Sequence, residues 1–498
     1  MIPGDAPPTP EPNRVVTSRG GAGRRGSVAT ITRRTAVGAL ATTGLGFALF
    51  GPRQAQEAPA GRVVIDYWEK WTGQEGAAMQ AVVDRINSLQ SRIYVRYFSM
   101  SAIDQKALVS MAGGAPPDLI GLWNFSLPQF VEAGALADLA VLDRQHADAV
   151  SRAFADEYGL APADSVLAPE YYAPQVWRLN FHNSLIAGMV NTCSTMGLYY
   201  NRAAFRDVGL DPEDPPKTIA ELDEAADRLT TYKPGSSTDS PRLDRAGFLH
   251  REPGWWNWLW GYHFGGKLYD PETNTATAAA PENVRGYEWL QSYPKKYGTD
   301  TLVSFQSGFG GYNSVQQALL SDQVAMTLHG SFLANVIQRF KPDFDYAAAP
   351  FPVAAEIYDP TQPVGLIESD TLCIPSAARH PREAYEFLRF TQRRENVERL
   401  ARLHAKPSPL RYSPPSFAEG HTNKYIEIHN RIAQSERAFP KPLTRVWPQY
   451  EQEFNAEIAK FWRAEIPAKD ILTEIERRAQ GMLDRAAAKR ARRDKANA

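Results

Sequence analysis

The chain has 498 residues, more than the roughly 100–200 residues of one domain, so the sequence predicts at least two globular domains. A composition of 43% hydrophobic, 11% aromatic and 22% charged residues is typical of a folded protein and excludes the disordered, collagenous and coiled-coil classes. The formal net charge of −1 excludes a global attraction to nucleic acid, and we expect no nucleic-acid partner.

Residues 1–60 are expected to form an export signal and leader. A basic segment ending in Arg33 and Arg34 precedes an uncharged apolar run, Ala36 to Phe50, and a polar Ala-rich segment follows. This order is typical of a secretory signal, and the apolar run is shorter than the roughly 20 residues of a transmembrane helix. The arginine pair resembles a twin-arginine export signal, which implies export of a folded protein. We therefore expect a periplasmic protein that does not span the membrane.

Strand and helix patterns alternate after the leader. Residues 62–68, 93–98 and 116–123 have strand composition, and a helix ending at paired glycines is predicted between the second and third of them. Between the first two, Met79, Val82, Val83 and Ile86 recur at helical spacing. This βαβ alternation predicts a parallel sheet covered by helices.

A second α/β unit is predicted from the helix over 215–229. Thr218 is placed to cap this helix, and Glu221 three residues later is typical of a capping box. Further strands are expected over 195–201, 321–329 and 370–376, and a helix over 381–390. The sequence shows no internal repeat.

Nine motifs in one order resemble a known family. They are YWEKWTGQEG, PPDLIGLWN, FVEAGALADL, MGLYYNRAAF, PPKTIAELDEAADRL, LLSDQVAMTLHGSF, APFPV, SDTLCIPSAARHPREAYEFLRF and LHAKPSP. Together they resemble the extracellular solute-binding proteins of bacterial ABC sugar importers, of the maltose- and glycerol-phosphate-binding type, over roughly residues 62–483. The resemblance implies a carbohydrate or polyol ligand, ABC permease subunits as partners, a monomer, no cofactor and no enzymatic activity.

The resemblance also implies an α/β fold of two lobes, with a three-stranded hinge and a ligand cleft that closes between them. Its crossings are expected near 192–200, 324–329 and 366–374. The expected division assigns 61–192 plus 329–368 to the first lobe, 193–328 plus 369–484 to the second, and 485–498 to a basic, solvated tail.

Candidate ligand-binding residues follow two predicted strands. A sugar has CH-rich faces that suit flat aromatic rings and a rim of hydroxyls that suits charged and amide groups. Glu69, Lys70 and Trp71 end the first strand, and Trp123 and Asn124 end the third, where open α/β sheets place ligands. The alternative is structural: the tryptophans pack under the following helices and Asn124 is a cap.

Trp255 and Trp256 begin the densest aromatic segment, GWWNWLWGYHF. If this segment is helical, its tryptophans face two sides and cannot all line one cleft, so we expect one of the first two to stack on ligand and the others to be core.

The remaining candidates lie at or after the implied crossings. Glu368 and Asp370 are two residues apart on one strand face and are placed to accept hydroxyl hydrogen bonds, or they belong to a solvated turn. The other candidates are Thr195, His329, Ser331, Phe332, Arg411 and Trp447, of which Phe332 is placed where the family stacks an aromatic ring on sugar.

The principal enzyme alternative is a secreted glycoside hydrolase, with Glu69 and Glu368 as its carboxylate pair. A secreted adhesion module is the third class. The sequence lacks nucleophile-elbow, zinc-protease, nucleotide-phosphate and dinucleotide motifs, and its nine histidines show no metal-ligand spacing. Oligosaccharides, polyols and glycerol phosphate all remain open as ligands.

Cys193 and Cys373 are the two cysteines. The resemblance places them on or beside the first and third crossings, where either a disulfide or two buried free thiols is possible.

Overall fold

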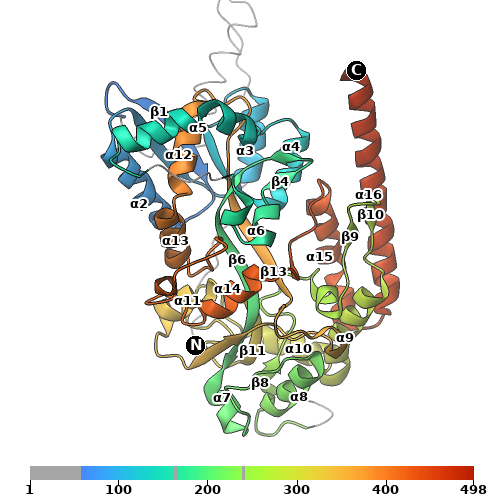
Figure 1. Cartoon of the computed structure of the whole chain (residues 1–498). Helices are drawn as coiled ribbons and strands as arrows, with labels where there is room; N and C mark the ends of the chain where they lie inside the picture. Colours follow the sequence, from blue (N-terminus) through green and yellow to red (C-terminus); the bar gives the residue numbers. More distant parts are fainter. Residues whose placement is uncertain (1–57, 162–166, 238–241, 498) are drawn as a thin grey trace, which may run out of the picture. The chain divides into compact units, whose positions relative to one another are not determined.

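The computed structural model describes residues 58–161, 167–237 and 242–497, and the chain from residue 57 onward forms one compact unit (Figure 1). Residues 1–57 of the expected export signal lie outside the described residues. Two groups of elements, called lobe 1 and lobe 2 here, surround separate hydrophobic cores.

Lobe 1 surrounds a core that includes Tyr67, Val83 and Phe387, and a smaller core that includes Ile103 and Phe130. Its elements are β1 (Val63–Glu69), α2 (Gly73–Leu89), β2 (Ile93–Ser99), α3 (Ile103–Ala112), β3 (Leu119–Trp123), η1 (Asn124–Ser126), α4 (Leu127–Glu132), α5 (Leu139–Asp156), η2 (Pro169–Tyr171), α6 (Pro174–Arg178), β4 (Phe181–His182), β5 (Leu185–Ile186), α12 (Pro381–Thr391), α13 (Arg394–Leu403), η5 (Pro415–Phe417) and α14 (Ile426–Gln434).

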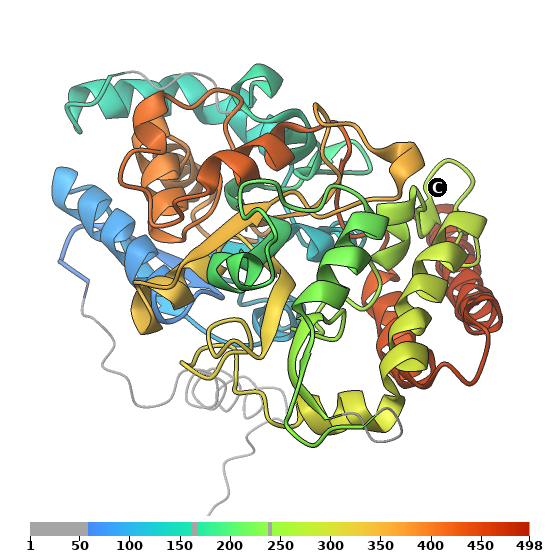
Figure 2. The ribbon, with the colours of Figure 1, turned by 90° about the horizontal axis from the view of Figure 1, so that it is seen from below.

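Lobe 2 surrounds a core that includes Phe248, Trp258 and Trp447, with a smaller core around Leu333 and Tyr346. Its elements are α7 (Arg202–Asp207), α8 (Ile219–Leu229), β7 (Thr231–Tyr232), β8 (Leu243–Phe248), η3 (Trp260–Phe264), β9 (Tyr269–Asp270), β10 (Thr275–Ala276), α9 (Pro281–Tyr297), α10 (Thr299–Gln306), β11 (Val324–Gly330), α11 (Leu333–Phe340), β12 (Tyr346–Ala349), η4 (Ala355–Ile357), α15 (Trp447–Arg463) and α16 (Ala468–Asn497). Seen from below, the yellow-green helix α9 lies beside the red helices α15 and α16 (Figure 2).

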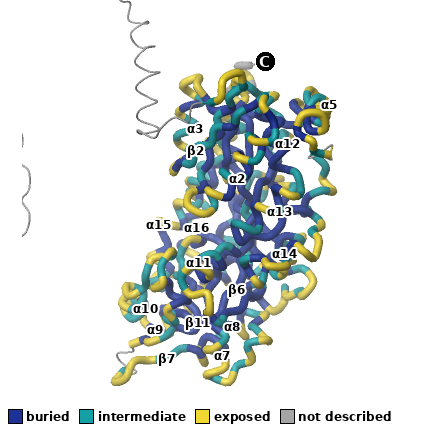
Figure 3. The backbone as a smooth tube through the Cα atoms, turned by 90° about the vertical axis from the view of Figure 1, so that its left-hand side faces the viewer, coloured by how far each residue is buried: buried dark blue, intermediate teal, exposed yellow. Residues whose placement is uncertain are grey.

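Three further strands run between the lobes: β6 (Met189–Asn201), β13 (Gly365–Cys373) and β14 (Ala438–Phe439). Within the described residues, ten strands form one sheet in the order β2-β1-β3-β13-β6-β11-β8-β7, with β12 added to β6 and β14 to β13. The predicted parallel pairing holds in lobe 1, where β1 pairs with β2 from Val63–Ile93 to Glu69–Ser99. Every residue of β6 is buried, and Figure 3 shows this strand in dark blue.

The chain passes between the two cores at three neighbouring strands. In β6, Cys193 belongs to the core of lobe 1 and Met196 to that of lobe 2, and Leu366 and Ile367 divide in the same way in β13. The third passage lies in β14 (Ala438–Phe439), which pairs with β13. The expected passage at 324–329 is wrong, because β11 pairs with β6 and β8 and is buried within lobe 2.

The segments after β11 are therefore distributed differently from the expected division. Hydrophobic residues between 333 and 366 pack in the cores of lobe 2, whereas those between 367 and 410 pack in lobe 1. The expected division assigns 329–368 to the first lobe and 369–484 to the second. It differs from the structure because the expected passage at 324–329 does not exist, and the chain stays in lobe 2 until it returns to lobe 1 along β13.

Local sequence signals explain the main helices. In α2, the predicted stripe of Met79, Val82, Val83 and Ile86 is buried against the sheet. At the start of α8, Thr218 Oγ1 accepts a hydrogen bond from the Glu221 amide at 3.3 Å, and the Glu221 carboxylate accepts one from the Lys217 amide at 2.8 Å. The cap satisfies amides that the helix itself leaves unpaired.

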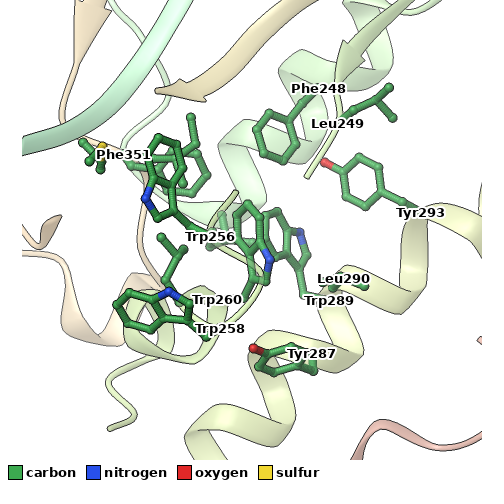
Figure 4. Packing of buried hydrophobic residues seen from close by; sticks show 14 of the residues in the cluster. Phe248, Leu249, Trp256, Trp258, Trp260, Tyr287, Trp289, Leu290, Tyr293 and Phe351 are labelled. Atoms are coloured by element: carbon green, nitrogen blue, oxygen red, sulfur yellow. The ribbon is translucent and has the colours of Figure 1, made fainter. Parts of the chain in front are cut away.

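The tryptophan-rich segment is not an α-helix. Its first half forms turns and residues 260–264 form the 3₁₀ helix η3. Trp258 and Trp260 point into the core of lobe 2, with Trp289 and Phe248 close to Trp260 (Figure 4). Trp447, also a candidate for the cleft, is fully buried against Trp258.

Helix α16 packs on lobe 2 through residues such as Leu472, Ile475 and Leu483. Of the side chains described after that point, all but Ala486 are exposed, so the described part of the expected basic tail is solvated. Among the described residues, no helix combines the length and apolar character needed to cross a membrane.

Cys193 and Cys373 are both buried and free. Cys193 lies opposite Ser369, four residues before Cys373 on β13, so the two Cα atoms are offset along the strands by roughly 13 Å at about 3.3 Å per residue. A disulfide needs less than about 7 Å, and the register therefore excludes the bond in this structure.

Candidate functional site

A cleft of about 660 Å³ opens between the two lobes, where β1 and β3 end. The segment after β1, the turn after β3, and residues of β6 and β13 line it from lobe 1 and the passages, while lobe 2 contributes two loops and one face of α11. The lining residues are Lys70, Trp71, Thr72, Gly73, Gln74, Glu75, Trp123, Phe125, Ser194, Trp255, Trp256, Tyr312, Asn313, Phe332, Asn335, Val336, Arg339, Glu368, Ser369, Asp370, Lys406 and Lys441.

Asp370 holds two lysines at the floor of the cleft. Its Oδ1 lies 3.1 Å from Lys70 Nζ and its Oδ2 lies 2.9 Å from Lys406 Nζ. Each lysine has a second carboxylate partner: Glu69 lies 3.1 Å from Lys70 and Glu75 lies 3.3 Å from Lys406. Charges buried this deeply are stable only when they are paired and hydrogen-bonded.

The pairing shows in the protonation of these groups. Burial alone would raise the pKa of Asp370, but the ammonium groups of Lys406 and Lys70 outweigh it and hold the pKa well below its usual range. Burial would likewise lower the pKa of both lysines, and the neighbouring carboxylates raise it instead. Asp370, Lys70 and Lys406 therefore stay ionised at neutral pH.

A second charged group surrounds Lys441, which follows β14. Its Nζ lies 3.5 Å from Glu368 and 3.1 Å from Glu451 of α15, and 4.0 Å from the centre of the Phe125 ring. Burial raises the pKa of Glu368, although Lys441 opposes that shift. This lysine thus joins the floor of the cleft to a helix of lobe 2.

Two exposed tryptophans face the cleft from different lobes. Trp123 of lobe 1 is 37% exposed and stacks on Phe125, with ring planes 9° apart. Trp255 of lobe 2 is 43% exposed and packs edge-on against Trp256 and Tyr312. Both rings line the cleft, so their exposed faces are open to a molecule placed there.

His329 lies beneath the aromatic wall of lobe 2. Its ring is 5.3 Å from that of Tyr312 at 13°, 5.5 Å from that of Trp255 and 5.5 Å from that of Phe332. Burial lowers the pKa of His329 to about 4, so the imidazole is neutral at pH 7. It supports the wall and does not line the cleft.

The structure brings most of the predicted site residues together. Those that line the cleft are Lys70, Trp71, Trp123, Trp255, Trp256, Phe332, Glu368 and Asp370. Trp71 does so from a buried position, edge-on to His404.

Six predicted residues do not line the cleft. Glu69 is buried behind Lys70 and accepts a hydrogen bond from Tyr67 at 2.5 Å. Asn124 Oδ1 accepts from the Ser369 amide at 2.9 Å, and Thr195 Oγ1 lies 2.9 Å from His429 Nδ1. The other three are His329, described above, Ser331, whose carbonyl accepts from Asn423, and Arg411, whose amide donates to the Tyr171 carbonyl in lobe 1. Side chains that point into the protein from these strands and loops form hydrogen bonds with neighbouring elements. The position of a residue in the sequence does not reveal whether its side chain points inward or into the cleft.

Several cleft residues were missed. Phe125 directly follows the predicted Asn124, and Gln74 and Glu75 lie three and four residues after the predicted Trp71, so the strand ends carried a signal for them. Lys406 lies within the LHAKPSP motif, but its burial depends on Asp370 and Glu75. Tyr312, Asn335, Arg339 and Lys441 had no sequence signal, because tertiary packing brings them to the cleft.

The fold and the cleft define a two-lobed α/β binding protein. The sequence matches the model of the bacterial extracellular solute-binding protein family over residues 70–398, and the chain belongs to this family.

Solved structures of similar fold include CpMnBP1 with mannobiose bound, with a TM-score of 0.66 and 22% identity over 84% of this chain and 100% of that one. The cyclic α-maltosyl-1,6-maltose binding protein of Arthrobacter globiformis has a TM-score of 0.65 and 18% identity over 85% and 99%. UgpB of Mycobacterium tuberculosis, in complex with glycerophosphocholine, has a TM-score of 0.63 and 18% identity over 86% and 100%.

Among curated proteins, the sn-glycerol-3-phosphate-binding periplasmic protein UgpB of Yersinia pestis is 27% identical over 179 residues. The match covers 35% of this chain and 36% of that relative, so it spans about a third of each.

Proposed function

We propose that this protein is the extracytoplasmic carbohydrate-binding subunit of an ABC importer. The observation that carries the proposal is the interlobe cleft, where exposed faces of Trp123 and Trp255 lie beside a rim of ionised and amide groups. Flat rings suit the CH faces of a sugar, and carboxylates and lysines suit its hydroxyls.

The charges of the cleft favour a ligand made mainly of neutral polyhydroxy units. Lys70, Lys406 and Lys441 are each flanked by two carboxylates, so a phosphate placed among them would meet negative charge at close range. The carboxylates around the lysines therefore favour an oligosaccharide over glycerol phosphate. Similar proteins whose names mention mannobiose and cyclic maltosyl-maltose support the same ligand class.

The three passages support capture of the ligand by closure of the lobes. Bending at β6, β13 and β14 would bring the tryptophan of each lobe onto the ligand, as in the hinge closure of periplasmic binding proteins. The closed monomer would then deliver the ligand to the permease subunits. The leader, residues 1–60, would direct export to the periplasm, preferentially through the twin-arginine route.

The protein itself would catalyse no reaction. In the hydrolase alternative Glu69 and Glu368 would flank the scissile bond, yet Glu69 is fully buried behind Lys70 and does not line the cleft. A pair of carboxylates that cannot both reach the substrate does not support glycoside hydrolysis.

The test is a thermal-shift screen of the mature protein against a panel of oligosaccharides, polyols and glycerol phosphate, followed by calorimetry on each hit. A ligand at 100 times its Kd adds about 2.7 kcal/mol of stability. Products are analysed after prolonged incubation. An oligosaccharide that stabilises the protein and is recovered intact supports the proposal; hydrolysis that Glu368→Gln abolishes favours the enzyme; stabilisation by glycerol phosphate alone contradicts the carbohydrate assignment.

A further inference from the structure

The two walls of the cleft differ in charge. Lobe 1 and β13 supply Lys70, Lys406 and three carboxylates, and Lys441 follows the passage β14, whereas the two loops and helix α11 of lobe 2 supply aromatic rings, two amides and Arg339. Among the described residues, Arg339 is therefore the charged side chain that these loops and α11 contribute to the cleft lining.

Arg339 also differs from the other cations of the cleft in its surroundings. It lies in the last turn of α11, its side chain is exposed, and the described residues place no carboxylate within ion-pair distance of it. Lys70, Lys406 and Lys441 each lie within 3.5 Å of two carboxylates. An anionic group on a ligand would be repelled among the lysines and attracted at Arg339.

A second polar group stands one helical turn from this arginine. Asn335 also lines the cleft, and its side-chain oxygen is buried without a hydrogen-bond partner among the described residues. On a helix, residues four apart share one face. Asn335 and Arg339 thus offer an amide and a guanidinium to the same ligand unit, beside the ring of Phe332.

We infer that the natural ligand is a glycan with one acidic sugar, a uronic acid whose carboxylate pairs with Arg339 while its ring lies near Asn335 and Phe332. A carboxylate suits this position because a planar guanidinium binds it with two parallel hydrogen bonds. A phosphate carries more negative charge than a carboxylate, and among the described residues Arg339 alone would have to compensate it at this position. The inference rests on the proposed function and narrows its ligand class.

The test compares matched sugars on the mature protein. Calorimetry is run with cellobiose and cellobiouronic acid, with maltose and maltobiouronic acid, and with glucose 6-phosphate, beside an array of neutral and uronic-acid oligosaccharides. We expect the acidic member of a bound pair to bind about tenfold or more tightly than the neutral one, with a preference that falls at high salt. In Arg339→Gln, the ratio of the two affinities should fall toward one.

Arg463→Gln is the matched control, because Arg463 is another exposed arginine of lobe 2 and does not line the cleft. This variant should keep the preference for the acidic sugar.

Equal binding of the acidic and the neutral sugar by the unmodified protein would overturn the inference. An equal loss of affinity for both sugars in Arg339→Gln would also overturn it and would indicate that Arg339 acts in lobe closure. Tighter binding of glucose 6-phosphate than of any uronate would assign the position to phosphate. Binding of neutral glycans alone leaves the proposed function intact and refutes this inference, whereas binding of no glycan refutes both.

Discussion

The imidazole of His329 lies nearly parallel to the phenol ring of Tyr312, with 5.3 Å between ring centres and 13° between ring planes. Trp255 and Phe332 complete a shell of rings around the same imidazole. These three rings, which line the cleft from lobe 2, therefore rest on a histidine that is neutral at pH 7, and this contact links the cleft wall to pH.

Protonation of His329 should weaken the fold as the pH falls. Burial lowers the pKa from 6.5 to about 4, so between these values the unfolded chain binds the proton and the folded protein does not. The stability that neutral His329 contributes is therefore fully present above pH 6.5 and is lost as the pH falls toward about 4. His329→Phe keeps a ring and removes the charge. We expect the slope of unfolding free energy against pH, from urea denaturation, to decrease in this variant by up to about 1.4 kcal/mol per pH unit. An unchanged slope would contradict the prediction.

Removing either exposed tryptophan should weaken binding without unfolding the protein. Trp123→Ala and Trp255→Ala each delete a ring face open to the cleft, and we expect about a tenfold loss of affinity for the identified ligand, with little change in Tm. Trp258→Ala is the matched control. Its ring is fully buried, so it should cost about 3–5 kcal/mol of stability. Unchanged affinity in both cleft variants would place the ligand elsewhere.

Much of the fold was predictable because local patterns determine its elements. The stripe of α2 and the cap of α8 lie where the sequence predicts them, and Lys70 and Trp123 reach the cleft because they end parallel strands. The third passage was not predictable. A two-residue strand, Ala438–Phe439, has no periodicity to detect, whereas the longer β11 resembles a passage and lies within lobe 2.

The ionic floor of the cleft was predictable only in part. Lys70 follows a recognisable strand and Asp370 lies within another, but Lys406 and Lys441 are buried because carboxylates distant in sequence compensate their charge. An isolated lysine in a sequence is expected to be exposed, since an unpaired lysine is almost never buried. Likewise His329 was expected to touch ligand, and only its ring contacts show that it lies behind Trp255.

Export should depend on the arginine pair of the leader. Replacing Arg33 and Arg34 with lysine keeps the charge and removes the twin-arginine motif, so we expect precursor to accumulate in the cytoplasm. Fractionation and intact-mass measurement check this outcome. Replacing Arg24 and Arg25 with lysine is the control and should leave export unchanged. Periplasmic protein that retains Met1 would contradict cleavage of the leader.

The two cysteines should remain thiols after export. Cys193 and Cys373 are separated along β13 by the strand register and both are buried, where burial raises the pKa of each thiol. We expect a thiol reagent to label neither residue in the native protein and both under denaturing, non-reducing conditions. Protein purified from the periplasm with no titratable thiol would refute this prediction.

Breaking the buried lysine network should destabilise lobe 1. Lys406→Met removes the ammonium that lies 2.9 Å from Asp370 and 3.3 Å from Glu75, and it leaves Asp370 with Lys70 as its remaining ammonium partner. Removing one partner of a buried ion pair costs about 3–5 kcal/mol, and because Lys70 remains we expect about 3 kcal/mol by urea denaturation. Lys460→Met is the matched control: this lysine pairs with Glu457 from a half-exposed position, so the change should cost at most about 1 kcal/mol. If both variants unfold at the same urea concentration, the charge of Asp370 is compensated without Lys406, and the floor of the cleft is less tightly coupled than these distances indicate.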